Sequence, residues 1–419
     1  MQKINNIINL GCRLNIYEGE VIKSLASQNN IKNYTIINSC AVTAKAEKKL
    51  RYEIRKAKRK YPNNKIVVTG CAAQISPKKY SNIKDVNYVI GNKEKLESST
   101  WASIENAEFI QVNDIFEITK NQYHKIENFD GKARAYIEVQ HGCDHRCTFC
   151  IIPYGRGNNK SVPVGIIVNH INTLVNNGYN EIVLTGVDIT HYGKDLPGSP
   201  NLFQLVRRIF NLAPKLKQLR LSSIDCAEIN EDFWPLLKEK RFMPYFHLSL
   251  QSGNDLILKR MKRRHSKKEI IDFCNKVRKI RSDVVFGADI IAGFPTETKK
   301  MFEDTIEVID KCNLTHLHIF PYSKRKLTPA SKMPQVPSNI IKERARILRN
   351  IGKKNLLKYL KKQIGSFSIV LVEKNELESS IGKSQYFTKV KINKNLKEGS
   401  LVKCKIYDVE ENILQAKIL

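Results

Sequence analysis

Between residues 134 and 322 the sequence alternates short apolar runs with segments of helical periodicity, and this alternation limits the possible folds most strongly. Strands that alternate with helices predict a parallel sheet. Six such units without the glycine pattern of a dinucleotide-binding fold favour an incomplete parallel barrel, (β/α)6. The predicted strands are Arg134–Gln140, Glu181–Val187, Gln218–Ile224, Tyr245–Gln251, Val284–Ile291 and His316–Tyr322, with helical segments such as 201–212 and 266–281 between them.

The first 95 residues show the same alternation, with a cysteine closely following each apolar run. Apolar runs at 7–10, 34–37 and 65–68 predict buried strands, and helices are expected near 15–30 and 44–60. The carboxyl ends of parallel strands share one edge of the sheet. We therefore expect Cys12, Cys40 and Cys71 to converge there. The alternative is three unrelated core cysteines.

The pattern changes near residue 363, after a basic helix predicted at 338–362. Alternating polar and apolar residues then predict a small all-β barrel. Its predicted strands are Phe367–Val372, Tyr386–Ile392, Leu401–Tyr407 and Ile413–Leu419. Residues 98–130 have weak periodicity and are interpreted as a connection. The predicted fold class is thus α/β, with a parallel α/β domain at 1–110, a partial barrel at 129–360 and a β-barrel at 361–419.

The chain is strongly basic: its 419 residues include 71 Lys and Arg against 41 Asp and Glu, a net charge of +30. Such a charge favours a nucleic-acid partner, although a lysine-rich surface that only confers solubility is the alternative. The candidate phosphate-binding segments are 44–60, 259–268 and 338–362. No run of 18 apolar residues occurs, and the first residues lack the apolar stretch of a signal peptide. We therefore predict a cytoplasmic protein without a membrane span.

Three of the ten cysteines form a C-x3-C-x2-C pattern directly after the first predicted barrel strand. These are Cys143, Cys147 and Cys150, and closely spaced thiolates on one loop are typical ligands of an iron–sulfur cluster. Three ligands leave one iron of a four-iron cluster open for a substrate or cofactor. A zinc ion would need a fourth ligand, which His141 or His145 could supply. The remaining four, interpreted as buried apolar residues, are Cys226, Cys274, Cys312 and Cys404.

This pattern, with Phe149 before its last cysteine, resembles the radical-SAM superfamily. The resemblance implies that the three cysteines hold a [4Fe-4S] cluster whose open iron binds S-adenosylmethionine. The reduced cluster would cleave this cofactor to a 5′-deoxyadenosyl radical. By their positions at or near the strand ends, several residues are expected to contact the cofactor, the alternative being that they are turn residues. They are Phe149, Gly186, Val187, Asp188, Ser222 and Ser223.

The segments around the other three cysteines are similar to the amino-terminal domain of the radical-SAM methylthiotransferases. They are 11–15 (GCRLN), 38–43 (NSCAVT) and 69–74 (TGCAAQ). The resemblance implies that Cys12, Cys40 and Cys71 hold a second [4Fe-4S] cluster, which carries the sulfur to be inserted. It also implies that the carboxyl-terminal barrel is like the TRAM domain, a tRNA-binding module.

Further segments resemble the branch of this family that acts on N6-threonylcarbamoyladenosine in tRNA. They are Cys150–Gly157, Leu184–Thr190, Leu221–Asp225 and Phe286–Glu297, whereas Asn158–Lys160, Cys226 and Ser323–Thr328 depart from the usual pattern. The implied reaction replaces C2–H by C2–SCH3 in the adenosine 3′ of the anticodon. The implied partners are the tRNA anticodon loop, an electron donor such as flavodoxin or ferredoxin, and a sulfur donor. Two alternatives stay open: methylthiolation of a ribosomal-protein aspartate, and a non-enzymatic zinc-bearing RNA-binding protein.

Overall fold

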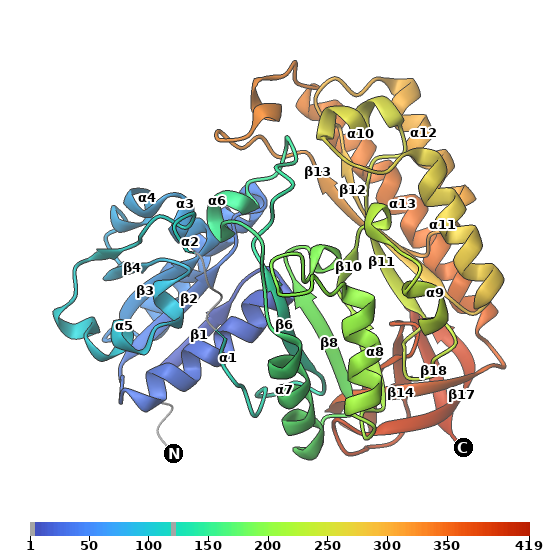
Figure 1. Ribbon diagram of the computed structural model, residues 1–419, viewed down its shortest axis with the longest axis horizontal. Coiled ribbons are helices and arrows are strands. Elements are labelled where there is room, and N and C mark those ends of the chain that lie inside the picture. The colour runs from blue at the N-terminus through green and yellow to red at the C-terminus, as the bar shows by residue number, and fades with distance from the viewer. Residues whose placement is uncertain (1–4, 119–122) are drawn as a thin grey trace.

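The amino-terminal part is a parallel sheet of five strands in the order β1-β2-β3-β4-β5, seen at the left of the computed structural model in Figure 1. The structure describes residues 5–118 and 123–419. Residues 1–4 of the amino-terminal segment and 119–122 of the predicted connection lie outside this description. The strands are β1 (Asn5–Asn9), β2 (Tyr34–Ser39), β3 (Lys65–Gly70), β4 (Tyr88–Ile90) and β5 (Ile110–Gln111).

Helices cover both faces of this sheet. The main ones are α1 (Arg13–Gln28), which packs between the sheet and the central barrel, and α2 (Ala44–Lys60), which covers the opposite face. Shorter helices are α3 (Cys71–Ile75), α4 (Pro77–Ser81) and α5 (Ser98–Ala102). The interpretation of 98–130 as a mere connection is wrong in part, because α5 and β5 lie there and β5 completes the sheet.

The central part is a partial barrel, as predicted, whose six parallel strands curve through the middle of Figure 1. Its third strand is broken at Ser222, so that β9 pairs with β8 and β10 pairs with β11. The strands are β6 (Ala135–His141), β8 (Glu181–Gly186), β9 (Gln218–Leu221), β10 (Ser223–Ile224), β11 (Tyr245–Gln251), β12 (Val285–Ala292) and β13 (His316–Pro321). A short strand, β7 (Lys160–Ser161), pairs antiparallel with β6.

The helices around the barrel have clear sequence signals. Capping boxes start α8 at Asn201 and α11 at Ser266. In each, the side chain of the first residue accepts from the backbone N–H three residues later, and that later side chain accepts from the first residue's N–H. The helices are α6 (Ile152–Arg156), α7 (Val164–Asn176), α8 (Leu202–Leu212), α9 (Phe233–Leu236), α10 (Asp255–Met261), α11 (Lys267–Ile280), α12 (Lys299–Lys311) and α13 (Ser338–Lys362). Within the described residues no helix is long and apolar enough to cross a membrane.

The carboxyl-terminal part is a closed five-stranded barrel, as the alternating pattern predicted. Its strands are β14 (Phe367–Glu376), β15 (Ser379–Ser384), β16 (Lys389–Ile392), β17 (Leu401–Glu410) and β18 (Ile413–Ile418). The sequence prediction missed β15, whose only large apolar residue is Ile381. It also began β16 at Tyr386, three residues too early.

This small barrel packs against the amino-terminal ends of the central strands (Figure 1). The guanidinium of Arg220 donates to the carbonyl oxygens of Ser384 and Gln385 at 2.9 and 2.8 Å. The ring of Phe387 stacks on that of Tyr245 with centroids 5.4 Å apart. The guanidinium of Arg220 lies 5.3 Å from the centre of the Phe387 ring. The floor of the central barrel is therefore closed by the last part of the chain.

Candidate metal centres

Cys143, Cys147 and Cys150 lie on the loop that connects β6 to α6, at the carboxyl-terminal face of the barrel. The loop folds tightly on itself: the N–H of Cys143 donates to Gly157 O at 3.0 Å, and that of Cys150 to Cys147 O at 3.0 Å. Gly142 has φ +69°, and a Cβ on it would lie 1.8 Å from the carbonyl oxygen of Asn158. Only glycine fits there, so the backbone itself gathers the three thiols.

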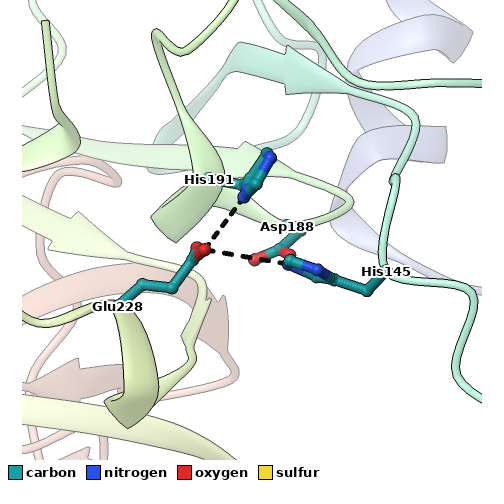
Figure 2. Close-up of side chains that lie close together, drawn as sticks. All are labelled: His145, Asp188, His191 and Glu228. Carbon is teal, nitrogen blue, oxygen red and sulfur yellow. Dashed lines mark hydrogen bonds and ion pairs between the residues drawn. The ribbon is translucent and has the colours of Figure 1, made fainter. Parts of the chain in front are cut away.

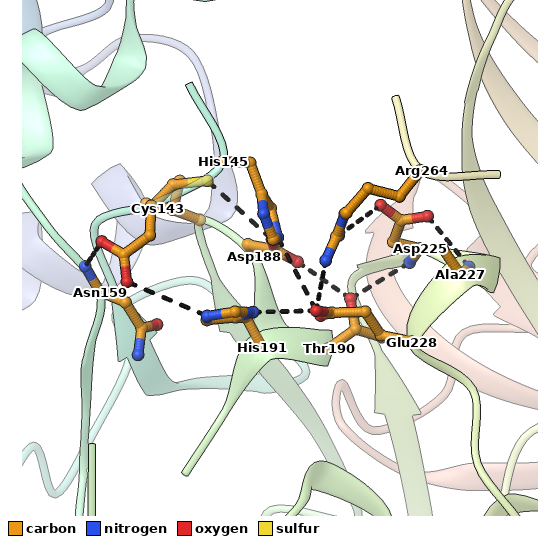
Figure 3. Close-up of polar contacts among 12 residues, drawn as sticks. Cys143, His145, Asn159, Asp188, Thr190, His191, Asp225, Ala227, Glu228 and Arg264 are labelled. Atoms are coloured by element: carbon orange, nitrogen blue, oxygen red, sulfur yellow. Dashed lines mark hydrogen bonds and ion pairs between the residues drawn. The ribbon is translucent and has the colours of Figure 1, made fainter. Parts of the chain in front are cut away.

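The carboxylate of Asp188 lies beside Cys143 of this triad (Figure 3) and points toward His145 (Figure 2). Its Oδ2 is 3.9 Å from Cys143 Sγ and 2.6 Å from His145 Nε2. Burial, together with the nearby carboxylate of Asp188, raises the pKa of the Cys143 thiol to about 12. The thiol is therefore protonated without a metal, and binding of a cationic metal centre must release this proton.

A second histidine and a glutamate extend this polar group. His191 Nδ1 lies 2.9 Å from Glu228 Oε1, and Arg264 also contacts this carboxylate (Figure 3). The ligand atoms of His145, Asp188, His191 and Glu228 all lie within 4.8 Å of one another. Arg264 and Lys194 both pair with Glu228 and offset its charge. A divalent metal ion is therefore disfavoured at this position.

The residues expected near the cofactor are distributed over three places. Gly186 ends β8, and Val187 and Asp188 follow it directly. Gln140 Oε1 accepts from the N–H groups of Val187 and Asp188 at 3.0 and 2.8 Å. Ser222 and Ser223 lie at the break between β9 and β10. Phe149 and Cys150 line a cavity of about 170 Å³.

The second set of cysteines converges at the carboxyl edge of the amino-terminal sheet. Cys12 precedes α1, Cys40 follows β2, and Cys71 begins α3 directly after β3. Gly11 has φ +96°, and a Cβ on it would lie 2.6 Å from Cys40 Cβ. Burial and the nearby Cys71 raise the pKa of the Cys40 thiol to about 12. Residues far apart in sequence thus form a second cysteine triad.

Helix α6, which follows the first triad, packs against the second triad. Gly155, five residues after Cys150, approaches so closely that a Cβ on it would lie 3.1 Å from Cys71 Cβ. Arg156, on the same helix α6, donates from Nε to Cys71 Sγ at 3.1 Å. The cavity lies at this junction, with walls from Val42 and Thr43, from Phe149–Ile152, and from the ends of β11, β12 and β13.

Three thiolates suit a four-iron cluster with one open iron, whereas a structural zinc ion would need a fourth ligand. Tetrahedral zinc with bonds of about 2.3 Å needs sulfur atoms roughly 3.8 Å apart. In the part of the chain that the structure describes, neither cysteine triad is among the groups whose ligand atoms all lie within 4.8 Å. A cubic cluster takes one thiolate per iron and holds the sulfurs further apart. His141, a possible zinc ligand, is instead buried with Nδ1 2.7 Å from Glu138 Oε1.

Two expectations from the sequence need correction. In the segment 259–268, Arg263 is buried against Asp225 at 2.8 Å and points NH1 at Cys147 Sγ at 3.7 Å, so it does not face a polyanion. Arg264 pairs with the same aspartate. Cys226 is only half-buried, whereas Cys274, Cys312 and Cys404 lie in the core as predicted.

Several residues at the site escaped sequence reasoning, among them Arg156, Gln140, His191 and Glu228. Gln140 contacts Asn159, 19 residues away, His191 contacts Glu228, 37 residues away, and Arg156 contacts Glu18, 138 residues away. One signal was present: Arg156 lies only six residues after Cys150, at the end of a segment quoted for its resemblance to a family.

Comparison with known proteins places the chain in a class. The model of the Radical SAM superfamily matches residues 137–309, and that of the uncharacterized protein family UPF0004 matches 5–91. The fold is similar to that of a solved radical S-adenosylmethionine methyltransferase, TsrM from Kitasatospora setae, with a TM-score of 0.56 at 14% identity. The match covers 79% of this chain and 77% of the TsrM chain. The fold and the first cysteine triad thus define a radical-SAM enzyme, which implies a [4Fe-4S] cluster and S-adenosylmethionine.

Relatives narrow this class. The chain is 50% identical over 414 residues to the threonylcarbamoyladenosine tRNA methylthiotransferase MtaB of Rickettsia prowazekii (strain Madrid E), covering 99% of this chain and 97% of the relative. It is 34% identical to the protein of the same name from Aquifex aeolicus (strain VF5), covering 88% and 92%. The chain belongs to the radical-SAM methylthiotransferase family and is a transferase.

Iron content tests the two triads directly. Anaerobically reconstituted protein is expected to bind about eight irons per chain, because each triad fits one four-iron cluster. Replacement of Cys143, Cys147 and Cys150 by alanine should lower this to about four, as measured by iron and acid-labile sulfide analysis. A matched variant without the buried Cys274, Cys312 and Cys404 should keep the full amount. Undiminished iron after loss of the first triad would contradict the assignment.

Proposed function

We propose that this enzyme is a tRNA (N6-L-threonylcarbamoyladenosine-C2)-methylthiotransferase. It replaces the C2–H bond of the modified adenosine 3′ of the anticodon by C2–SCH3. The observation that carries the proposal is the 50% identity, over 99% of the chain, to a relative named for threonylcarbamoyladenosine in tRNA. The presence of two cysteine triads supports it, because the reaction needs both a radical and a source of sulfur.

In this proposal each triad holds one [4Fe-4S] cluster. Cys143, Cys147 and Cys150 hold the cluster that binds S-adenosylmethionine, while Cys12, Cys40 and Cys71 hold an auxiliary cluster. When bound, these groups supply the 5′-deoxyadenosyl radical and the sulfur for the new bond. An electron donor such as flavodoxin or ferredoxin and a sulfur donor complete the system. We place the reaction in the cytoplasm, where tRNA is found.

The protein's own residues orient the cofactor. We propose that the methionine part of the cofactor contacts Gly186, Val187 and Asp188. These residues lie at the end of β8 and directly after it, and Asp188 is beside Cys143. The amide of Gln140 fixes the backbone of Val187 and Asp188. Ser222 and Ser223 are proposed to reach the ribose from the break in the third strand. Phe149, which lines the cavity with Cys150, is proposed as a further cofactor contact.

The cavity beside Cys150 is proposed to receive the adenine. Its walls include the apolar side chains of Phe149, Ile291 and Phe320, which exclude water from the reacting atoms. Gln251 and Asp289 add polar groups that could bind the edge of a base. The base must leave its stack to enter, which costs a few kcal/mol and less in an anticodon loop, where it is unpaired.

Helix α2 is proposed to guide the tRNA backbone toward this cavity. The helix starts next to Thr43, which lines the cavity, and its outer face is rich in exposed cations. They are Lys45, Lys48, Lys49, Arg51, Arg55, Lys56, Arg59 and Lys60. Each phosphate contact releases counterions and strengthens binding. We further propose that the chain divides functionally into 1–110, 129–360 and 361–419, with the last part as a second tRNA contact.

The substrate assignment has a direct test. Purified, reconstituted enzyme should form 2-methylthio-N6-threonylcarbamoyladenosine on tRNA that carries the threonylcarbamoyl group, detected by mass spectrometry of nucleosides. The same tRNA transcribed without the group should react at least tenfold more slowly. Equal turnover of both would rule out this branch. A methylthiolated aspartate in a ribosomal protein, with no tRNA product, would replace the proposal by the sister activity.

A further inference from the structure

Arg156 is almost completely buried, with 1% of its surface exposed, and every nitrogen of its guanidinium has a partner. Nε donates to Cys71 Sγ at 3.1 Å. NH2 donates to Asn15 Oδ1 at 2.7 Å and to Glu18 Oε2 at 2.9 Å, and NH1 contacts the other oxygen of Glu18. The planar group is thus fixed at both ends and cannot turn its Nε–H away from the sulfur.

The buried charges around Arg156 balance only if the triad of Cys12, Cys40 and Cys71 carries a negative charge. Glu18 accepts from two fully buried cations, Arg156 and Lys95, the latter at 2.7 Å. Lys95 is otherwise held by the amide oxygens of Asn92 and Asn38. One carboxylate therefore faces two cations, and burial of an uncompensated charge is costly. Three thiolates on an oxidised four-iron core carry one net negative charge, which offsets the excess.

Arg156 also belongs to the element that carries the other triad. It ends α6, which follows Cys150 after a single residue, Ile151. On the same helix, the carbonyl oxygen of Gly155 accepts from Asn92 Nδ2, and this amide also lies 3.8 Å from Cys71 Sγ. The contact between the arginine and the auxiliary triad is therefore built into the junction of the two parts of the chain.

We propose that Arg156 is a positioning residue that raises the reduction potential of the auxiliary cluster through its hydrogen bond and charge at Cys71. This inference rests on the proposed auxiliary cluster. A donor and a positive charge at a ligating sulfur stabilise the reduced form, which carries one more negative charge than the oxidised form. The arginine favours electron acceptance by the auxiliary cluster and leaves the first cluster unaffected.

The test is a redox titration followed by electron paramagnetic resonance on the full chain, reconstituted anaerobically. In a background with Cys143, Cys147 and Cys150 changed to alanine, the auxiliary cluster is the only one left. There Arg156→Gln should shift the midpoint potential to a more negative value. Arg156→Lys, which keeps the charge but loses the Nε–H, should give a smaller shift in the same direction. In the reciprocal background, without Cys12, Cys40 and Cys71, Arg156→Gln should leave the first cluster's potential unchanged.

Arg220 provides the matched control, because it is equally buried and bonded to a glutamate, Glu181, but lies at the opposite end of the barrel. Arg220→Gln should not move the auxiliary potential. The inference is overturned if Arg156→Gln retains the cluster at an unchanged potential, or if Arg220→Gln gives the same shift. It is also overturned if both Arg156 variants lose the auxiliary iron while Arg220→Gln keeps it, since Arg156 would then serve assembly alone. Absence of iron in the parent background would instead refute the auxiliary cluster itself.

Discussion

Replacing Cys12, Cys40 and Cys71 together by alanine is expected to leave reductive cleavage of S-adenosylmethionine measurable and to abolish methylthiolation of tRNA. The reason is that different supports hold the two triads. One lies at the edge of the five-stranded sheet, and the other on a loop closed by its own backbone hydrogen bonds. Loss of Cys12, Cys40 and Cys71 therefore does not remove the ligands of the cluster that binds S-adenosylmethionine.

The converse substitution should have a different outcome. Cys143→Ala is expected to abolish both 5′-deoxyadenosine formation and the tRNA product, because the cluster that binds the cofactor loses a ligand. Chromatography of 5′-deoxyadenosine and nucleoside mass spectrometry give the two readouts from one reaction. Cys226→Ala, at a half-buried cysteine outside both triads, serves as the control and should retain both products. Methylthiolated tRNA from the Cys12, Cys40 and Cys71 variant would disprove the sulfur-supplying role.

Glu18→Ala is expected to be the most destabilising single substitution at the junction of the triads. Burial alone would raise the pKa of Glu18, but Arg156 and Lys95 outweigh it and hold that pKa well below its usual range. Removing the carboxylate leaves two buried cations without their shared partner. Breaking a buried ion pair in this way costs about 3–5 kcal/mol.

Thermal unfolding of the cluster-loaded protein under anaerobic conditions measures this effect. Glu18→Ala should lower the unfolding midpoint clearly. Glu20→Ala, two residues along the same helix and only half-buried, should change stability by about 0.5 kcal/mol or less. Similar midpoints for the two variants would show that Glu18 does not offset the charges of Arg156 and Lys95.

The sequence predicted the strands well because most central strands are largely buried and contain several apolar residues, as in β8 and β12, although β13 is only partly buried. It also predicted the convergence of Cys12, Cys40 and Cys71, since the edge of a parallel sheet follows from topology alone. It failed where the signal is weak. Strand β15 has the sequence Ser379-Ser-Ile-Gly-Lys-Ser384, with a single large apolar residue, and its place is set by pairing with β14 and β16.

Charged residues at the site were the least predictable. In the sequence Arg263 belongs to a basic segment and Arg156 to the motif Cys150–Gly157. Their partners in the structure, Asp225 and Cys71, lie 38 and 85 residues away. A count of charge cannot distinguish a cation that faces solvent from one that is buried beside a sulfur. That distinction depends on packing between elements, which periodicity does not report.

The closed floor of the central barrel has a consequence for how this protein could be divided or recombined. Ser384, Gln385 and Phe387 of the last barrel supply the acceptors and the ring that Arg220 requires at the ends of the central strands. A chain cut at the end of α13 would expose Arg220 and Glu181 to water along with the aromatic surface of Tyr245. The carboxyl-terminal barrel is thus not an interchangeable attachment, and a chimaera that imports another such barrel must also import the matching strand ends.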